Sequence, residues 1–88
     1  MFESQSFRLD GDVTLVTGGA AGIGLAIAET FASAGSAVMI SDRDRGAAED
    51  AAAKLVNAGG NVAAIGCDVT KEDDLVRSID ATQSMFGG

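Results

Sequence analysis

The stretch "VTLVTGGAAGIGLAIAETF" runs from Val13 to Phe31 and changes its pattern at its glycines. Before them, Val13–Thr17 is an apolar run rich in β-branched residues, which is typical of a strand buried on both faces of a parallel sheet. After them, apolar residues recur at helical spacing, at Ile23, Ala26, Ile27, Phe31 and Ala34. The stretch therefore predicts a strand, a glycine-rich turn and a helix.

The same unit recurs twice along the chain. "AVMIS" at 37–41 and "NVAAIG" at 61–66 predict two further strands. Between them, an Ala-rich helix is expected from Asp44 to Ala58, with an inner side formed by Ala48, Ala51, Ala52, Leu55 and Val56. Thr70 with Asp73 resembles a capping box before a last helix, whose inner stripe is Leu75, Ile79, Thr82 and Phe86. This β-α-β-α-β-α order predicts an α/β fold with a parallel sheet.

The hand of the connections predicts how the helices cover this sheet. Right-handed crossovers place the first two helices on one face and start the last helix across the other. A doubly wound sheet would then add a fourth strand beside strand 13–17, and none follows before Gly88. We therefore expect the first three β-α units of a doubly wound parallel (Rossmann) sheet, truncated before strand 4. Residues 1–88 would be the N-terminal portion of a single NAD(P)-binding Rossmann domain, and the open edge of strand 13–17 would promote self-association.

Composition excludes several classes of function. The 88 residues carry a formal net charge of −7, so neither nucleic acid nor an anionic membrane surface is an expected partner. The lone Cys67 cannot form an internal disulfide, has no companion at metal-ligand spacing, and is expected to be a small buried residue. No apolar run is long enough to span a membrane, and the start lacks a signal-peptide core. A cytoplasmic protein without a metal site is expected.

The glycines between the first strand and the first helix predict a dinucleotide site. Gly18 permits a tight turn, Gly22 lets the backbone approach a ligand, and Gly24 lets the helix pack closely on the sheet. The free N–H groups and the positive dipole end of the helix favour a diphosphate. The alternative is a turn with only a structural role. A P-loop is excluded because no Gly-Lys-Ser/Thr sequence follows.

Asp42, at the end of the second strand, predicts NAD rather than NADP. Its carboxylate would accept hydrogen bonds from the ribose hydroxyls, and a 2′-phosphate at ~4 Å would be repelled by about 4 kcal/mol at an effective dielectric of ~20. Arg43 and Arg45 favour the phosphate, whereas Ala21 supplies no basic group. The alternative roles are a helix N-terminal acid for Asp42 and a solvated side chain for Arg43.

These residues resemble a known family. "TGGAAGIG" at 17–24 is similar to the TGxxxGxG motif of the short-chain dehydrogenase/reductase family, and "CDVT" at 67–70 resembles the segment after its third strand. "RLDGDVTLVTG" resembles the usual start of that fold, so the resemblance covers the chain from Arg8 onward. Within the family, "MFESQSFRLDG" and "AGIGLAIAETFASAG" look most like the bacterial 7α-hydroxysteroid dehydrogenases.

The resemblance implies further contacts and a reaction class. Ile23 would contact the pyrophosphate through its backbone, and Asp68 and Val69 would hold the adenine. The family transfers a hydride between an alcohol carbon and the nicotinamide, using Ser, Tyr and Lys residues that come later in its members. The chain contains no tyrosine, so we assign no catalytic residue, and an alcohol or ketone substrate is expected only in a full-length parent.

Two hypotheses follow for the function. The first is the cofactor-binding part of an NAD-dependent oxidoreductase acting on a secondary alcohol or ketone, such as a hydroxysteroid. The second is a stand-alone dinucleotide-binding module without catalysis. Among the remaining residues, Met39 and Met85 are expected in the core, and the acids at 72–74 are interpreted only as a helix start that favours negative charge.

Overall fold

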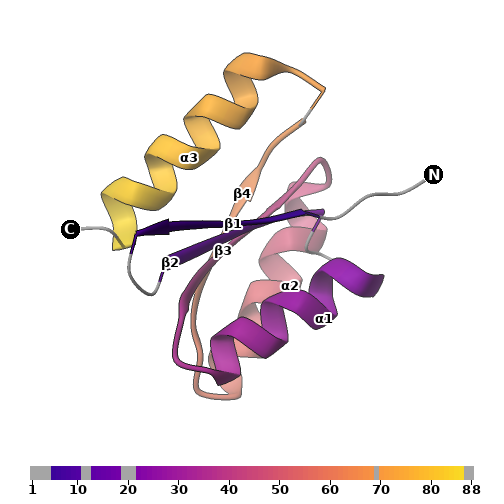
Figure 1. Ribbon diagram of the computed structural model, residues 1–88. Coiled ribbons are helices and arrows are strands. Elements are labelled where there is room, and N and C mark those ends of the chain that lie inside the picture. Colours follow the sequence, from indigo (N-terminus) through magenta and orange to yellow (C-terminus); the bar gives the residue numbers. More distant parts are fainter. Residues whose placement is uncertain (1–4, 11–12, 19–21, 69, 87–88) are drawn as a thin grey trace.

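The computed structural model describes residues 5–10, 13–18, 22–68 and 70–86, and alternates strands with helices (Figure 1). Within these residues the element order is β1 (Gln5–Asp10), β2 (Val13–Thr17), α1 (Gly22–Ser33), β3 (Ala37–Asp42), α2 (Arg45–Asn57), β4 (Asn61–Gly66) and α3 (Glu72–Phe86). The three predicted β-α units are confirmed, and β1 precedes them.

The described strands form one sheet in the order β1-β2-β3-β4. β2, β3 and β4 are parallel, with Leu15 level with Met39 and Ile40 level with Ala64. β1 pairs antiparallel with β2, from Gln5 opposite Thr17. The expectation of an open β2 edge is therefore wrong. A buried strand needs partners for its N–H and C=O groups, and an antiparallel neighbour can supply them through a short connection.

The helices divide between the two faces as the handedness argument predicted. α1 and α2 lie on one face of the sheet and α3 lies on the other (Figure 1). The core under α1 and α2 is a cluster of aliphatic side chains and alanines: Val16, Ala28, Val38, Ile40, Ala48, Ala51, Ala52 and Leu55. The small α2 residues let that helix approach the sheet closely, which favours dispersion contacts.

The face under α3 is more polar. Strand alternation turns Leu15 and Met39 away from the first cluster and towards α3, and both are fully buried. From the helix side the buried residues are Ser78 and Thr82, whose hydroxyls donate to the carbonyls of Asp74 and Ser78. These hydroxyls are satisfied within their own helix, so their burial leaves no unpaired donor.

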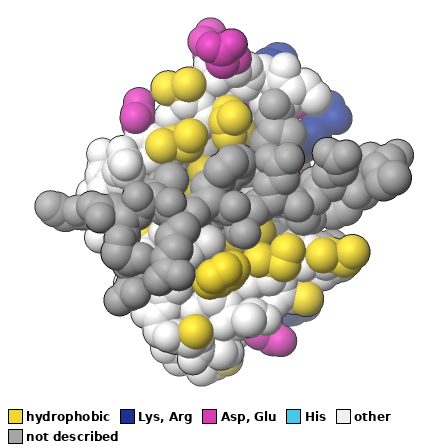
Figure 2. Space-filling view, in the orientation of Figure 1, with side chains coloured by type: hydrophobic (Ala, Val, Ile, Leu, Met, Phe, Trp, Pro, Cys, Tyr) yellow, Lys and Arg dark blue, Asp and Glu magenta, His cyan; other side chains and the backbone are white. Residues whose placement is uncertain are grey.

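Several side chains predicted to be inside are exposed. Val56 and Met85 are 49% and 60% exposed, so their assignment to the core is wrong, whereas the buried positions of Met39 and Cys67 are confirmed. Val56 follows Leu55 directly, and adjacent helical residues point about 100° apart. Hydrophobic side chains also reach the surface over α1 and α3 in Figure 2.

Glycines close the connection from α2 to β4. Gly59 has a φ of 100°, the left-handed conformation that glycine adopts without strain, and its N–H donates to the Val56 carbonyl at 2.9 Å. Gly60 donates to the Leu55 carbonyl at 2.9 Å. A Cβ atom on Gly60 would lie 3.0 Å from that carbonyl oxygen and 3.3 Å from Cβ of Ala32. The close packing of α2 against α1 and β4 therefore requires a residue without a side chain at position 60.

We expect Gly60→Ala to lower the free energy of unfolding by about 1–3 kcal/mol, because the new methyl group meets backbone and core atoms that have little room to move. Gly46→Ala is the matched control. Its Cβ would meet only the Asp44 carboxylate, at 3.5 Å, and alanine in a helix stabilises by about 0.5–1 kcal/mol. Urea unfolding of both variants measures the difference. Equal stability of Gly60→Ala and the wild type would contradict this packing.

Candidate dinucleotide site

The carboxyl ends of β2, β3 and β4 meet at one edge of the sheet. The Gly18 N–H, just after β2, donates to the Ser41 carbonyl at 2.6 Å. The Cys67 N–H, just after β4, donates to the Asp42 carbonyl at 2.9 Å. The parallel ladder thus continues into both turns, and it places Gly18, Asp42 and Asp68 on the same edge. Ligands of open α/β sheets bind at this edge.

The two described glycines that flank the residues after β2 have the backbone conformation that favours glycine. Gly18 and Gly22 have φ values of 65° and 60°, and a Cβ on Gly22 would meet none of the described atoms within 4 Å. Gly24 is buried in α1, whereas Ile23 is 72% exposed. The first turn of α1 is therefore open on its outer side, where its N–H groups favour an anion. Ala21 and Val69 lie outside the described residues.

Asp42 ends β3 and is not the residue that caps the next helix. Its Oδ1 accepts the Asp44 N–H at 3.1 Å. Asp44 is the N-cap of α2, and its own Oδ1 accepts the Ala47 N–H at 3.0 Å. The alternative role considered for Asp42, a helix N-terminal acid, is therefore filled by Asp44. The half-buried Asp42 is held in place by the turn that it begins.

The two arginines after Asp42 differ in their contacts. Arg43 Nε lies 4.0 Å from Asp68 Oδ2, which links the loop after β3 to the loop after β4. Arg45 Nε instead bonds Glu49 Oε2 at 3.2 Å along α2. The arginine side chains are 75% and 76% exposed, so each ion pair contributes little to stability. No periodicity predicts the first pair, because its partners are far apart in sequence.

Asp68 is fixed within a tight turn. Its Oδ1 accepts from the Thr70 N–H at 3.0 Å and from the Thr70 hydroxyl at 2.6 Å. The Thr70 hydroxyl donates within this turn, and the hydrogen bonds of the described residues include none between Thr70 and Asp73, so the predicted capping box is not formed. These two hydrogen bonds, the hydroxyl first, hold the pKa of the Asp68 carboxyl below its ordinary value of 3.8, and Arg43 acts in the same direction.

Asp74 contacts the same turn from α3. Its Oδ2 accepts the Asp68 N–H at 3.1 Å, and its Oδ1 is paired with Arg77. The bond to the Asp68 N–H, followed by the Arg77 contact, keeps the pKa of Asp74 below its ordinary value of 3.8. The interpretation of this acid as no more than a favourable charge at a helix start was incomplete. The spacing of six residues between Asp68 and Asp74 matches no helix or strand period, so the sequence pattern does not predict this contact.

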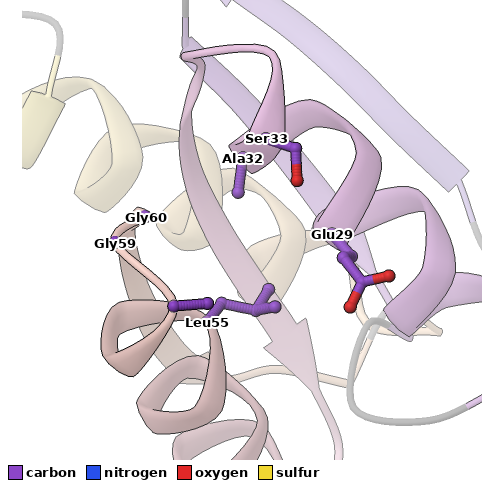
Figure 3. Close-up of a pocket in the computed structure, with 7 residues that line it drawn as sticks. Glu29, Ala32, Ser33, Leu55, Gly59 and Gly60 are labelled. Carbon is purple, nitrogen blue, oxygen red and sulfur yellow. The ribbon is translucent and has the colours of Figure 1, made fainter.

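A cavity lies at the other end of α1 and α2 (Figure 3). It has a volume of about 260 Å³ and is lined by Glu29, Ala32, Ser33, Leu55, Ala58, Gly59 and Gly60. The carbonyl ends of both helices lie here, and their partial charge is negative, as is Glu29. This environment repels a diphosphate, so the edge carrying Gly18, Asp42 and Asp68 remains the candidate site.

Comparison with known proteins agrees with this architecture. Residues 12–88 match the family model for short chain dehydrogenases, and the chain belongs to that family. It is 41% identical to 7α-hydroxysteroid dehydrogenase of Escherichia coli (strain K12) over 87 residues, which is 99% of this chain and 34% of the relative. The predicted resemblance is confirmed, and the chain spans about a third of that relative's length.

Two solved structures of related proteins have a similar fold. A 7α-hydroxysteroid dehydrogenase complexed with NADH and 7-oxo glycochenodeoxycholic acid matches with a TM-score of 0.84 and 41% identity, over 91% of this chain and 31% of that one. A short chain dehydrogenase/reductase from Burkholderia phymatum in complex with NAD matches with a TM-score of 0.84 and 34% identity, over 92% and 29%. The predicted Rossmann-type fold is therefore confirmed.

The described part of the chain lacks two other kinds of feature. Its helices include none long and apolar enough to cross a membrane. Nor do the described residues bring three or more His, Cys, Asp or Glu side chains together as a metal site would require.

We expect the turn around Asp68 to lose stability only in acid. Because the pKa values of Asp68 and Asp74 are lowered on folding, the stabilisation is complete above 3.8 and is lost as pH falls through the lower folded values. Carboxyl carbon chemical shifts followed by NMR over the acid range measure both pKa values. Thr70→Ala should return the Asp68 pKa towards 3.8. Titration of wild-type Asp68 at or above 3.8 would contradict the hydrogen bonds described.

Proposed function

We propose that this chain binds the ADP half of NAD at the edge where β2, β3 and β4 end. The observation that carries the proposal is the joining of three ligand-binding elements at one edge: the open first turn of α1, Asp42 and Asp68. The pyrophosphate would lie against the backbone from Gly18 to Gly24, including Ala21, Gly22 and Ile23. The complexes of related structures with NAD and NADH support this assignment.

Three residues would contact the adenosine part of the cofactor. The Asp42 carboxylate would accept from the ribose hydroxyls, and Asp68 with Val69 would hold the adenine. Asp68 Oδ1 is already occupied by Thr70, which leaves Oδ2 for the exocyclic amine. Asp42 would also repel a 2′-phosphate, so NAD is preferred to NADP. Arg43 does not oppose this preference strongly, because its guanidinium already neighbours Asp68.

The parent activity that we propose is oxidoreduction of a secondary alcohol or ketone, such as a hydroxysteroid. Two observations support it: the family, and the relatives described as 7α-hydroxysteroid dehydrogenases. Bound NAD would supply the hydride acceptor. This chain's own residues would bind and orient the ADP half, while catalytic Ser, Tyr and Lys residues would have to come from elsewhere.

The second candidate function is a dinucleotide-binding module without catalysis. The observation that favours it is the pairing of β1 with β2, which gives β2 a partner strand on each side.

Self-association through the edge of β2 is not favoured, because β1 pairs with that edge. A proposal that the chain self-associates rests instead on exposed apolar side chains, among them Ile23, Val76 and Met85.

We expect the protein to bind NAD more tightly than NADP. Asp42→Ala should reduce the ratio of the NAD affinity to the NADP affinity by about 10-fold or more, since removal of the carboxylate relieves its repulsion of the 2′-phosphate. Titration calorimetry with both cofactors measures each affinity. Arg43→Ala is the control, because it removes a neighbouring charge and should widen the gap. Tighter binding of NADP than of NAD by the unmutated protein would contradict the proposed role of Asp42 in cofactor choice.

We expect the 88-residue chain to produce no NADH from NAD with any secondary alcohol, bile acids included, because it contains no tyrosine to accept the hydroxyl proton. Absorbance of the reduced nicotinamide follows the reaction. Gly22→Asp, which places a like charge beside the diphosphate, distinguishes true turnover from a contaminant. A steady rise that this substitution abolishes would show that the chain is itself an enzyme.

A further inference from the structure

The backbone N–H of Asp68 is bonded to a side chain of α3. The Asp68 N–H points to α3 and donates to Asp74 Oδ2 at 3.1 Å. The turn also has internal contacts, in which the Lys71 N–H donates to the Asp68 carbonyl at 2.9 Å and Thr70 donates to the Asp68 carboxylate. Further contacts reach it from outside, since Arg43 Nε lies 4.0 Å from Asp68 Oδ2 and the Leu75 N–H donates to the Lys71 carbonyl at 3.1 Å. Among these contacts, the Asp74 bond is the one that holds the backbone N–H of Asp68 itself.

Asp74 is itself held in place. Its two carboxylate oxygens have separate partners, Arg77 for Oδ1 and the Asp68 N–H for Oδ2. The Ser78 hydroxyl also donates to the Asp74 carbonyl at 3.0 Å, and Ser78 is buried against the sheet. The acceptor is thus anchored through α3 to the core, and a fixed acceptor loses less conformational entropy when it makes its bond.

The neighbouring acids do not share this arrangement. Glu72 and Asp73 occupy the same first turn of α3 and carry the same charge, but both are exposed. Within the described residues, their carboxylates make no hydrogen bond or ion pair. Any effect of charge on the helix dipole is common to the three acids, whereas only Asp74 contacts the turn.

We propose that Asp74 is a positioning residue for the adenine subsite: by accepting the Asp68 N–H it fixes the place of the Asp68 carboxylate for the exocyclic amine of an adenine nucleotide. This inference rests on the proposed function. With Asp68 Oδ1 occupied by Thr70, the position of Oδ2 depends on where the backbone of the turn is held. Without the Asp74 bond the turn keeps its internal hydrogen bonds, but the Asp68 N–H loses its partner and the Asp68 carboxylate is held less firmly at the sheet edge.

The test combines two measurements on the full chain. Titration with 5′-AMP, which occupies only the adenosine part of the site, gives the affinity. Hydrogen exchange of the Asp68 amide, followed by NMR without ligand, reports whether its donor is bonded. The variants are Asp74→Ala, Asp74→Asn, Arg77→Ala and the matched control Asp73→Ala.

We expect Asp74→Ala to weaken AMP binding about 10-fold and to accelerate exchange of the Asp68 amide, because one hydrogen bond to a charged acceptor is lost. Asp74→Asn retains an acceptor oxygen and should restore both readouts to within about 3-fold, and Asp73→Ala should stay within about 2-fold. Arg77→Ala leaves the Asp74 carboxylate in place but removes its partner on Oδ1. We therefore expect a loss of AMP affinity between those of Asp73→Ala and Asp74→Ala. Arg77→Ala also serves as the test if Asp74→Ala does not fold.

Several outcomes would overturn the proposal. Equal AMP affinity of Asp74→Ala and the wild type would do so even if the amide becomes unprotected, since the bond would then not serve binding. Equal losses in Asp73→Ala and Asp74→Ala would assign the effect to charge alone. If Asp74→Ala does not fold, unchanged AMP affinity in Arg77→Ala would count against the proposal. Absence of AMP binding by the wild type would instead refute the proposed function, and the role of Asp74 with it.

Discussion

The parallel hydrogen-bond ladder does not stop where the strands end, and the candidate site depends on that continuation. The Gly18 N–H reaches the Ser41 carbonyl, and the Cys67 N–H reaches the Asp42 carbonyl. Each bond ties the first residue of a connecting turn to the neighbouring strand. The turns therefore leave the sheet at fixed points, and residues from three separate parts of the chain meet at one edge. Without these bonds, Gly18 and Asp68 would be positioned by loops alone, whereas Asp42 is held within β3.

The acids at this edge are held by backbone donors, while the arginines beside them are exposed. Asp42, Asp44, Asp68 and Asp74 each accept a backbone N–H. Arg43 and Arg77 approach Asp68 and Asp74 with side chains that are mostly exposed. A carboxylate fixed by the backbone discriminates between ligands better than a long cation that can turn away. For this reason the proposed preference for NAD rests on Asp42 more than on Arg43.

The same need for hydrogen-bond partners explains the far edge of the sheet. β2 is buried throughout, so its backbone groups cannot be left to water. β3 satisfies one side of the strand, and β1 satisfies the other by turning back through a short connection. In a doubly wound sheet a parallel strand would take this place. The antiparallel partner therefore fills a position that the architecture requires without adding a crossover.

The sequence by itself determined the three β-α units and motivated the proposed ligand. A β-branched run before Gly18 and helical spacing after Gly22 define the first unit, since residue periodicity follows directly from backbone geometry. The alternation of strands and helices then determines which edge collects Asp42 and Asp68. These inferences need only local patterns and one rule of handedness.

Only the tertiary structure decided the contacts between those units. The pairing of β1 with β2, the approach of Arg43 to Asp68, and the bond from the Asp68 N–H to Asp74 all join groups whose spacing carries no periodic signal. The exposure of Met85 is of the same kind, because an apolar residue on a helix is buried only where another element covers it. Local pattern states what each segment can be, whereas the choice among possible partners depends on which groups the folded backbone brings within a few ångströms of one another.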